Sequence, residues 1–203
     1  LEKNYKTYNY RIYLPKDYDE NKTYPTYIAL HGAGGRDLAF DNMEVEALTK
    51  VLEKNDSPLN NAIVVTPHCP YDSWYIHFNE LVDLFKEIYN RKDVDKTKFN
   101  IGGVSMGGYA AYSVMMVVPE IFNKAFICCG AGMYWNTNRI KNIKFKIFHG
   151  ELDGAVLAIE GKKMANNLKD CGADVSLYLY KDLAHNVWDI AYNNYENLNW
   201  IIS

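Results

Sequence analysis

What this sequence of 203 residues lacks excludes several classes of protein. No uninterrupted apolar stretch approaches the roughly 20 residues that a membrane-spanning helix needs. No block of lysine and arginine is present that could follow a phosphate backbone or an anionic membrane, and 22 basic against 25 acidic residues leave a net charge of −3. We therefore expect a soluble protein without a nucleic-acid or membrane partner.

Cysteines are few, and their spacing is not that of zinc ligands. Cys128 and Cys129 lie inside an apolar run, which predicts buried small side chains rather than metal ligands or a disulfide, and this favours a reducing compartment such as the cytoplasm. The chain begins at Leu1 rather than methionine, which suggests trimming or processing, so the localisation and any upstream segment stay open. The sequence leaves the oligomeric state open as well.

Internal repeats, low-complexity tracts and Gly/Ser-rich linkers are also absent. With 48% hydrophobic residues, the chain can bury one sizeable core, so residues 1–203 are expected to form a single domain. Short apolar runs alternate with segments of helical spacing, which is typical of a mostly parallel sheet with helices on both faces. The strands are expected at 8–14, 27–30, 62–65, 99–104, 124–129, 145–148 and 175–180, the first as an antiparallel edge strand, and the helices at 43–54, 78–89, 106–117, 157–168 and 190–201.

A tight turn between one such strand and the next helix carries the pattern G-x-S-x-G, from Gly103 to Gly107. Glycines flank the serine because the turn leaves no room for neighbouring side chains, and the turn projects Ser105 Oγ from the carboxyl end of the sheet. The following helix would direct backbone N–H groups and its positive dipole end toward developing negative charge. Ser105 is therefore predicted to be a nucleophile.

A serine hydroxyl needs a base within hydrogen-bonding reach and a third group that orients the base. His185 follows the last predicted strand, and Asp153 follows the strand that ends in FHG. The order Ser, Asp, His along the chain is the one that this fold class uses. Glu151 is the rival acid, and Asp153 is favoured because it lies farther into the turn. His31, His68, His77 and His149 are each interpreted as structural hydrogen-bonding residues.

A serine nucleophile of this kind transfers acyl groups, and the reaction also needs two hydrogen-bond donors for the negatively charged oxygen, the oxyanion, that forms on the attacked carbonyl. The segment HGAGG leaves the strand TYIAL, and its small residues allow its backbone to approach a ligand closely. We predict the amides of Ala33 and Met106 as the two donors, with Gly34 as the substitute for Ala33. A phosphate-binding loop is the alternative, but both the G-x-x-x-x-G-K-[ST] pattern and the strand-first G-x-G-x-x-G setting are missing.

These residues resemble the α/β-hydrolase superfamily over nearly the whole chain. The matching segments are RIYLPKDYDENKTYP, ALHGAGG, PHCPYDSW, IGGVSMGGYAAY, FHGELDGAV and AHNVWDIAY. More narrowly, the chain is similar to bacterial esterases labelled predicted peptidases or prolyl-oligopeptidase-like hydrolases, which lie near feruloyl and acetyl-xylan esterases. The resemblance implies an α/β-hydrolase fold, carboxylic-ester hydrolysis, a triad of Ser105, Asp153 and His185, and an oxyanion hole in HGAGG.

One departure concerns the cap domain that many lipases and peptidases of the superfamily insert after the sixth strand. Only about twenty residues separate Cys129 from His149, so we expect no lid and an open cleft. Aromatic side chains on loops near this cleft could stack on a phenolic or sugar ring. Gly34, Trp74 and Trp188 are predicted to bind substrate, and Tyr75, Tyr134 and Trp135 are further candidates for the rim.

The sequence therefore predicts a lidless serine carboxylesterase without metal or organic cofactor, acting on a small-molecule or polysaccharide-linked ester. Feruloyl or acetyl esters of plant polysaccharides are the leading substrates. A thioesterase or peptidase with the same triad is the second hypothesis, because the triad alone does not distinguish leaving groups. A non-catalytic binding module that kept the fold is the third.

Overall fold

The computed structural model describes residues 2–5 and 8–203, which build one eight-stranded sheet in the order β1-β2-β4-β3-β5-β6-β7-β8. β1 pairs antiparallel with β2, β2 pairs antiparallel with β4, and all other pairs are parallel. The strands are β1 (Glu2–Tyr5), β2 (Tyr8–Tyr13), β3 (Tyr24–Leu30), β4 (Ile63–His68), β5 (Val94–Val104), β6 (Lys124–Cys128), β7 (Lys144–Gly150) and β8 (Val175–Tyr180).

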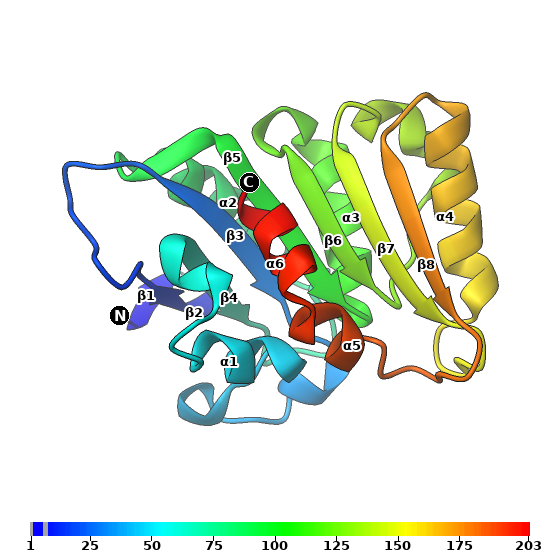
Figure 1. Ribbon diagram of the computed structural model, residues 1–203, viewed down its shortest axis with the longest axis horizontal. Helices are drawn as coiled ribbons and strands as arrows, with labels where there is room; N and C mark the ends of the chain where they lie inside the picture. Colours follow the sequence, from blue (N-terminus) through cyan, green and yellow to red (C-terminus); the bar gives the residue numbers. More distant parts are fainter. Residues whose placement is uncertain (1, 6–7) are drawn as a thin grey trace.

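Helices cover both faces of the sheet (Figure 1). The buried side chains of α2, α3 and α4 form one apolar cluster with the sheet, and those of α1, α5 and α6 form a second cluster on the opposite face. The α-helices are α1 (Glu46–Leu52), α2 (Phe78–Tyr89), α3 (Met106–Val117), α4 (Ala158–Asp170), α5 (Trp188–Asn193) and α6 (Tyr195–Ile202). Short 3₁₀ helices are η1 (Ala33–Gly35), η2 (Phe40–Asn42), η3 (Pro58–Asn61), η4 (Pro119–Ile121) and η5 (Tyr134–Ile140).

Three predicted elements have the boundaries that the sequence indicates, namely α2, α3 and β8. The C-terminal helix expected over 190–201 is instead two helices, because Asn194 has an extended backbone and its side chain accepts hydrogen bonds from the amides of Glu196 and Asn197. This is an N-cap, which starts α6 as a separate helix.

The prediction of an edge strand over 8–14 is wrong in one respect. β2 is antiparallel to β4, as expected, but β1 pairs with its other side and forms the edge of the sheet. The alternating burial of β2 is typical of a strand with one face on the core. That pattern does not reveal whether another strand pairs with its outer edge.

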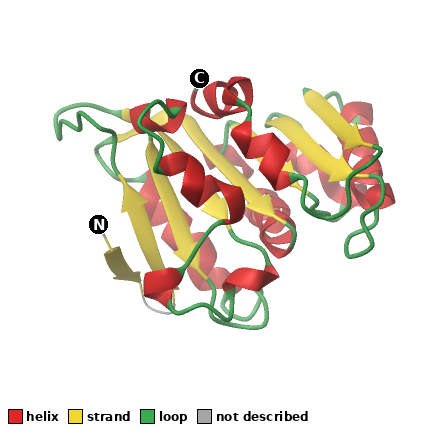
Figure 2. Cartoon of the chain, turned by 60° about the horizontal axis from the view of Figure 1, so that its bottom comes forward, coloured by secondary structure: helices red, strands yellow, loops and turns green. Residues whose placement is uncertain are grey.

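The parallel strands all point to one edge of the sheet, at the bottom of Figure 1, and Figure 2 brings this edge forward. The loop between β6 and β7 contains η5 and no inserted domain, so this edge carries no cap. The architecture is the α/β-hydrolase fold. Among the helices of the described residues, none combines the length and the apolar composition of a membrane-spanning segment.

Candidate active site

Ser105 lies in the turn between β5 and α3 with a backbone φ of 52° and ψ of −115°. A Cβ on Gly103 would lie 2.2 Å from the Gly107 carbonyl oxygen, and one on Gly107 would lie 2.2 Å from the Leu30 carbonyl oxygen. Both positions therefore require glycine. The turn is anchored because the Ser105 amide donates to the Cys128 carbonyl at 2.9 Å.

His185 and Asp153 meet Ser105 at the carboxyl edge of the sheet. His185 lies in the loop between β8 and α5, its Nε2 is 2.9 Å from Ser105 Oγ, and its Nδ1 is 2.7 Å from Asp153 Oδ2. Because Asp153 Oδ2 is an acceptor, Nδ1 carries the proton and Nε2 accepts from the serine hydroxyl. This is the arrangement in which the imidazole is ready to take the serine proton.

Asp153 is buried and its carboxylate is fully engaged. Oδ1 accepts hydrogen bonds from the amides of Ala155 and Val156, both at 2.9 Å. Burial by itself would raise the pKa of Asp153, but the hydrogen bonds from His185, Val156 and Ala155 outweigh it and lower that pKa. The carboxylate is thus ionised and can stabilise a positive charge on the imidazole.

The rival acid Glu151 takes no part in this arrangement. Its side chain is exposed and pairs with Lys162 at 3.0 Å. The next residues of the turn bring Asp153, and not Glu151, to His185.

The HGAGG segment forms η1 beside Ser105. Gly32, Ala33 and Gly34 line one cavity together with Ser105, and Met106 is the first residue of α3. Because the first N–H groups of a helix have no intrahelical acceptor, the Met106 amide is available to a ligand. A Cβ on Gly34 would meet no atom within 4 Å, so the cavity is open at this residue.

The buried ring of His31 packs against the HGAGG loop and forms hydrogen bonds that hold it. Its Nδ1 donates to the Gly32 carbonyl at 2.7 Å, and its Nε2 accepts from the Cys69 amide at 3.0 Å. A Cβ on Gly35 would lie 2.4 Å from His31 Nδ1, so the imidazole and the loop are in direct contact. Burial lowers the pKa of His31 to about 4, and the ring is therefore neutral in its structural role.

The other histidines outside the triad also make structural contacts. His68 Nε2 lies 3.2 Å from the Gly35 carbonyl, and His149 Nε2 lies 2.8 Å from the Val156 carbonyl. His77 directly precedes α2, and its Nδ1 lies 3.6 Å from a carboxylate oxygen of Glu80.

The predicted role of Trp74 in substrate binding is wrong. Its side chain is fully buried, it stacks on Tyr8, and its indole N–H donates to the His31 carbonyl at 3.2 Å. Trp74 therefore supports the loop from inside the core. Trp188 does line the cavity, with its ring at 89° to that of His185. Of the other candidate aromatics, Trp135 is exposed, but neither it nor Tyr75 is among the residues that line this cavity.

The cavity has a volume of about 360 Å³. Its lining residues are Gly32, Ala33, Gly34, Gly35, Leu38, Glu44, Glu46, Val104, Ser105, His185 and Trp188. Sequence reasoning missed Leu38, Glu44 and Glu46, because two glutamates at the start of an amphipathic helix are typical of a solvated helix end. Leu38 precedes η2, Glu44 precedes α1 and Glu46 begins α1, and only the tertiary fold brings the three side chains to the cavity.

One group of metal-capable side chains was found among the described residues, and it overlaps the triad. Cys129 Sγ, Asp153 and His185 have ligand atoms within 4.8 Å of one another. Burial raises the pKa of the Cys129 thiol well above its usual range, so the thiol keeps its proton and is a poor ligand. The geometry fits the hydrogen-bonded triad better than a metal centre.

The chain is similar to several known proteins. Over 149 residues, 65% of the chain, the sequence is 29% identical to endo-1,4-beta-xylanase Y of Acetivibrio thermocellus, but it spans only 14% of that protein. A thermostable esterase of known structure matches with a TM-score of 0.83 and 27% identity over 96% of this chain and 58% of that one. A ferulic acid esterase shares the fold, with a TM-score of 0.67 and 16% identity over 96% of this chain and 93% of that one.

A family model described as "Putative esterase" matches residues 5–146, which include Ser105 and the HGAGG loop and end before Asp153 and His185. Because this match covers well over half of the chain, the protein belongs to the esterase family.

Proposed function

We propose that this chain is a serine carboxylesterase that works through an acyl-enzyme intermediate. The observation that carries the proposal is the continuous hydrogen-bonded series from Ser105 Oγ through His185 to Asp153, which opens into the cavity beside the HGAGG loop. Membership of the esterase family supports the same reaction.

In the first step, Ser105 Oγ attacks the ester carbonyl carbon while His185 Nε2 takes the hydroxyl proton. The carbonyl oxygen becomes an oxyanion, which the amides of Ala33 and Met106 stabilise, with Gly34 as the alternative to Ala33. The tetrahedral intermediate then collapses, the carbon–oxygen bond to the alcohol breaks, and His185 returns the proton to the leaving alkoxide. Asp153 stabilises the imidazolium that exists between these two transfers.

In the second step, water replaces the alcohol. His185 takes a proton from the attacking water and later gives it to Ser105 Oγ, so that the carboxylic acid leaves and the enzyme is regenerated. The overall reaction converts an ester and water into an acid and an alcohol, and it needs no group beyond the chain itself.

Feruloyl or acetyl esters of plant polysaccharides are the proposed substrates. The likeness to a xylanase and the fold shared with a ferulic acid esterase support this class. The cavity offers apolar contact from Leu38 and an aromatic ring from Trp188, and no cap closes over it. An open cleft of this kind admits an acyl group that is attached to a bulky sugar chain.

Burst kinetics with a p-nitrophenyl ester test the reaction. The intact protein should release one equivalent of p-nitrophenol per active site before the steady state, and Ser105→Ala should abolish the burst. Ser113→Ala is the matched control on α3, because its hydroxyl contacts Tyr75 rather than the triad, and it should retain the burst. A Ser105→Ala variant with an unchanged rate would overturn the proposal.

Matched substrates separate the alternatives that use the same triad. Turnover of an ester, a thioester and an anilide with one acyl group distinguishes an esterase from a thioesterase or a peptidase. Absence of labelling by a fluorophosphonate probe would support a non-catalytic binding module. Methyl ferulate and acetylated xylan then test the proposed substrates directly.

A further inference from the structure

Glu46 is a half-buried acid that the reaction described above does not use. It is the first residue of α1 and has a backbone φ of 40°. Among the described residues, only Glu46, Ser105 and Cys129 combine a side chain with a positive φ. Such backbone strain persists where the surroundings enforce it, and it clusters at functional sites. All three of these residues lie around one site, since Cys129 adjoins the triad and Glu46 lines the cavity of Ser105.

The carboxyl of Glu46 is in contact with the HGAGG loop. Its Oε1 accepts a hydrogen bond from the Gly32 amide at 2.8 Å. A Cβ on Gly32 would lie 2.8 Å from this oxygen and 3.6 Å from Ser105 Cβ, so the carboxyl lies against the loop backbone near the nucleophile. Gly32 directly precedes Ala33, whose amide is a proposed oxyanion donor.

The second carboxyl oxygen, Oε2, differs from Oε1 in its surroundings. Oε2 is closed off from solvent and has no hydrogen-bond partner in the described part of the chain. The titratable groups near the carboxyl are Cys128 at the end of β6, Cys129 directly after it, and Tyr192 of α5. Burial raises the pKa of all three, so they remain uncharged.

The charged or titratable side chains that share the cavity with Glu46 are Glu44 and His185, and none of the described lining residues is a lysine or an arginine. None of these lining residues therefore carries a permanent positive charge that would compensate a charge on Glu46. Burial raises the pKa of Glu46 to about 8, which the hydrogen bond from Gly32 only partly opposes. At neutral pH the group is an uncharged carboxylic acid.

We propose that Glu46 is a positioning residue of the esterase reaction, because its uncharged carboxylic acid holds the Gly32 amide and so fixes the loop that presents Ala33 and Gly34. Ionisation of the same carboxyl inactivates the site at alkaline pH. The inference rests on the proposed function. Its physical basis is that a carboxylate in the lining of the cavity would repel the negative charge that develops on the carbonyl oxygen.

Three variants test this proposal: Glu46→Gln, Glu46→Ala and, as a matched control at the exposed end of α1, Glu53→Gln. The measurement is kcat and KM for p-nitrophenyl acetate between pH 6 and pH 10. Glutamine keeps an acceptor for the Gly32 amide but cannot ionise, so Glu46→Gln should remain active and lose the decline in kcat that the intact protein shows as pH rises through about 8.

Alanine removes the acceptor, so Glu46→Ala should lower kcat by about 10- to 100-fold, less than the roughly 100- to 1000-fold loss expected for removal of an oxyanion donor itself. KM should change much less than kcat. Glu53→Gln should follow the intact protein at every pH. The proposal is overturned if Glu46→Gln and the intact protein share the same alkaline decline, or if Glu46→Ala keeps full kcat.

Thermal unfolding provides a readout that does not depend on activity. The folded state keeps the Glu46 proton up to about pH 8, whereas an unfolded glutamic acid releases it near about pH 4.3. The folded state thus binds more protons between these values, and the group's contribution to stability falls as pH rises through this window.

The stability of the intact protein should therefore decline relative to Glu46→Gln from about pH 4 to about pH 8. A difference that does not change with pH would contradict an uncharged Glu46. If the intact protein hydrolyses no ester, the proposed function fails; if it hydrolyses esters but Glu46→Gln leaves the alkaline decline in place, only the present inference fails.

Discussion

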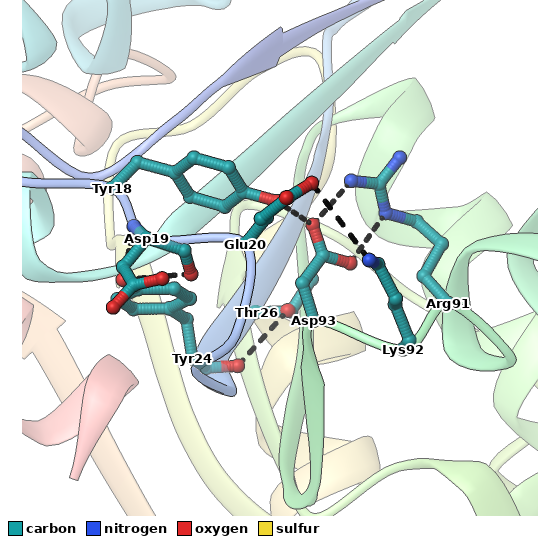
Figure 3. Close-up of polar contacts among 8 residues, drawn as sticks. All are labelled: Tyr18, Asp19, Glu20, Tyr24, Thr26, Arg91, Lys92 and Asp93. Carbon is teal, nitrogen blue, oxygen red and sulfur yellow. Dashed lines mark hydrogen bonds and ion pairs between the residues drawn. The ribbon is translucent and has the colours of Figure 1, made fainter.

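Two aspartates, Asp153 and Asp93, are almost equally buried, with exposed fractions of 3% and 2%, yet their partners differ. Asp93 receives two hydrogen bonds from the Arg91 guanidinium and one from the Tyr18 hydroxyl at 2.8 Å (Figure 3). Asp153 pairs instead with His185 and two backbone amides. The partner of Asp93 is permanently charged, whereas the partner of Asp153 can gain and lose a proton.

The two carboxylates also act at opposite ends of β5: Asp93 at its start, and Asp153, through His185, on Ser105 after its end. Asp93 directly precedes β5, and its carbonyl accepts from the Tyr24 amide, so the Arg91–Asp93–Tyr18 cluster ties the start of β5 to the loop that leads into β3. Ser105 directly follows the other end of β5. A fixed ion pair stabilises the scaffold, while a carboxylate beside a neutral imidazole is ready to stabilise charge that appears only during the reaction.

The largest expected effect comes from removing the negative charge of Asp153, which lies behind His185 in the active site. Asp153→Asn should lower kcat by about 10⁴-fold, because the imidazole loses its orienting acceptor and the stabilisation of its protonated form. Steady-state kinetics with a p-nitrophenyl ester measure the loss, and Glu151→Gln is the matched control two residues earlier. Equal losses for the two variants would show that the comparison assigns the wrong acid.

The same substitution at Asp93, at the start of β5, should affect stability instead of catalysis. Asp93→Asn leaves the Arg91 guanidinium without its counter-charge, and the free energy of unfolding should fall by about 3 kcal/mol. Denaturant unfolding measures this change. The kcat per folded molecule should remain that of the intact protein, and a large loss of kcat without a loss of stability would contradict a purely structural role.

Acid unfolding sharpens the same contrast. Burial alone would raise the pKa of Asp93, but the hydrogen bonds from Arg91 and Tyr18 lower it overall. Its stabilising contribution is therefore present above the pKa of an unfolded aspartic acid, about 3.9, and is lost as pH falls through the lower folded value. Asp93→Asn should make stability less dependent on pH in this acidic range, as thermal unfolding between pH 2 and pH 6 would show.

The smallest expected effects separate two tryptophans. Trp188→Ala should raise KM for an aromatic ester about fivefold, since a lost ring contact is worth about 1 kcal/mol. Trp74→Phe should leave KM unchanged and lower stability by about 1 kcal/mol, the typical value of one lost hydrogen bond. If Trp74→Phe raised KM and Trp188→Ala did not, the assignment of Trp188 to the cleft and Trp74 to the core would be reversed.

Local patterns in the sequence predict the elements and the candidate triad well. The glycines around Ser105 follow from steric requirements of a single turn, and the positions of Asp153 and His185 after predicted strands place both at the same edge of a parallel sheet. Alternation and helical spacing identify the other elements, although the added strand β1 and the break at Asn194 depend on contacts or caps that periodicity does not reveal.

The sequence by itself determined the alternation of strands and helices, the fold class and the side chains that meet at Ser105, because each of these follows from local spacing and from the rule that parallel strands end at one edge. Only the tertiary structure decided which loop residues face the cavity. It buried Trp74 beneath the HGAGG loop and brought Glu46 against Gly32. Burial depends on how segments distant in the sequence pack together, and a residue's type and its neighbours in the chain do not specify that packing.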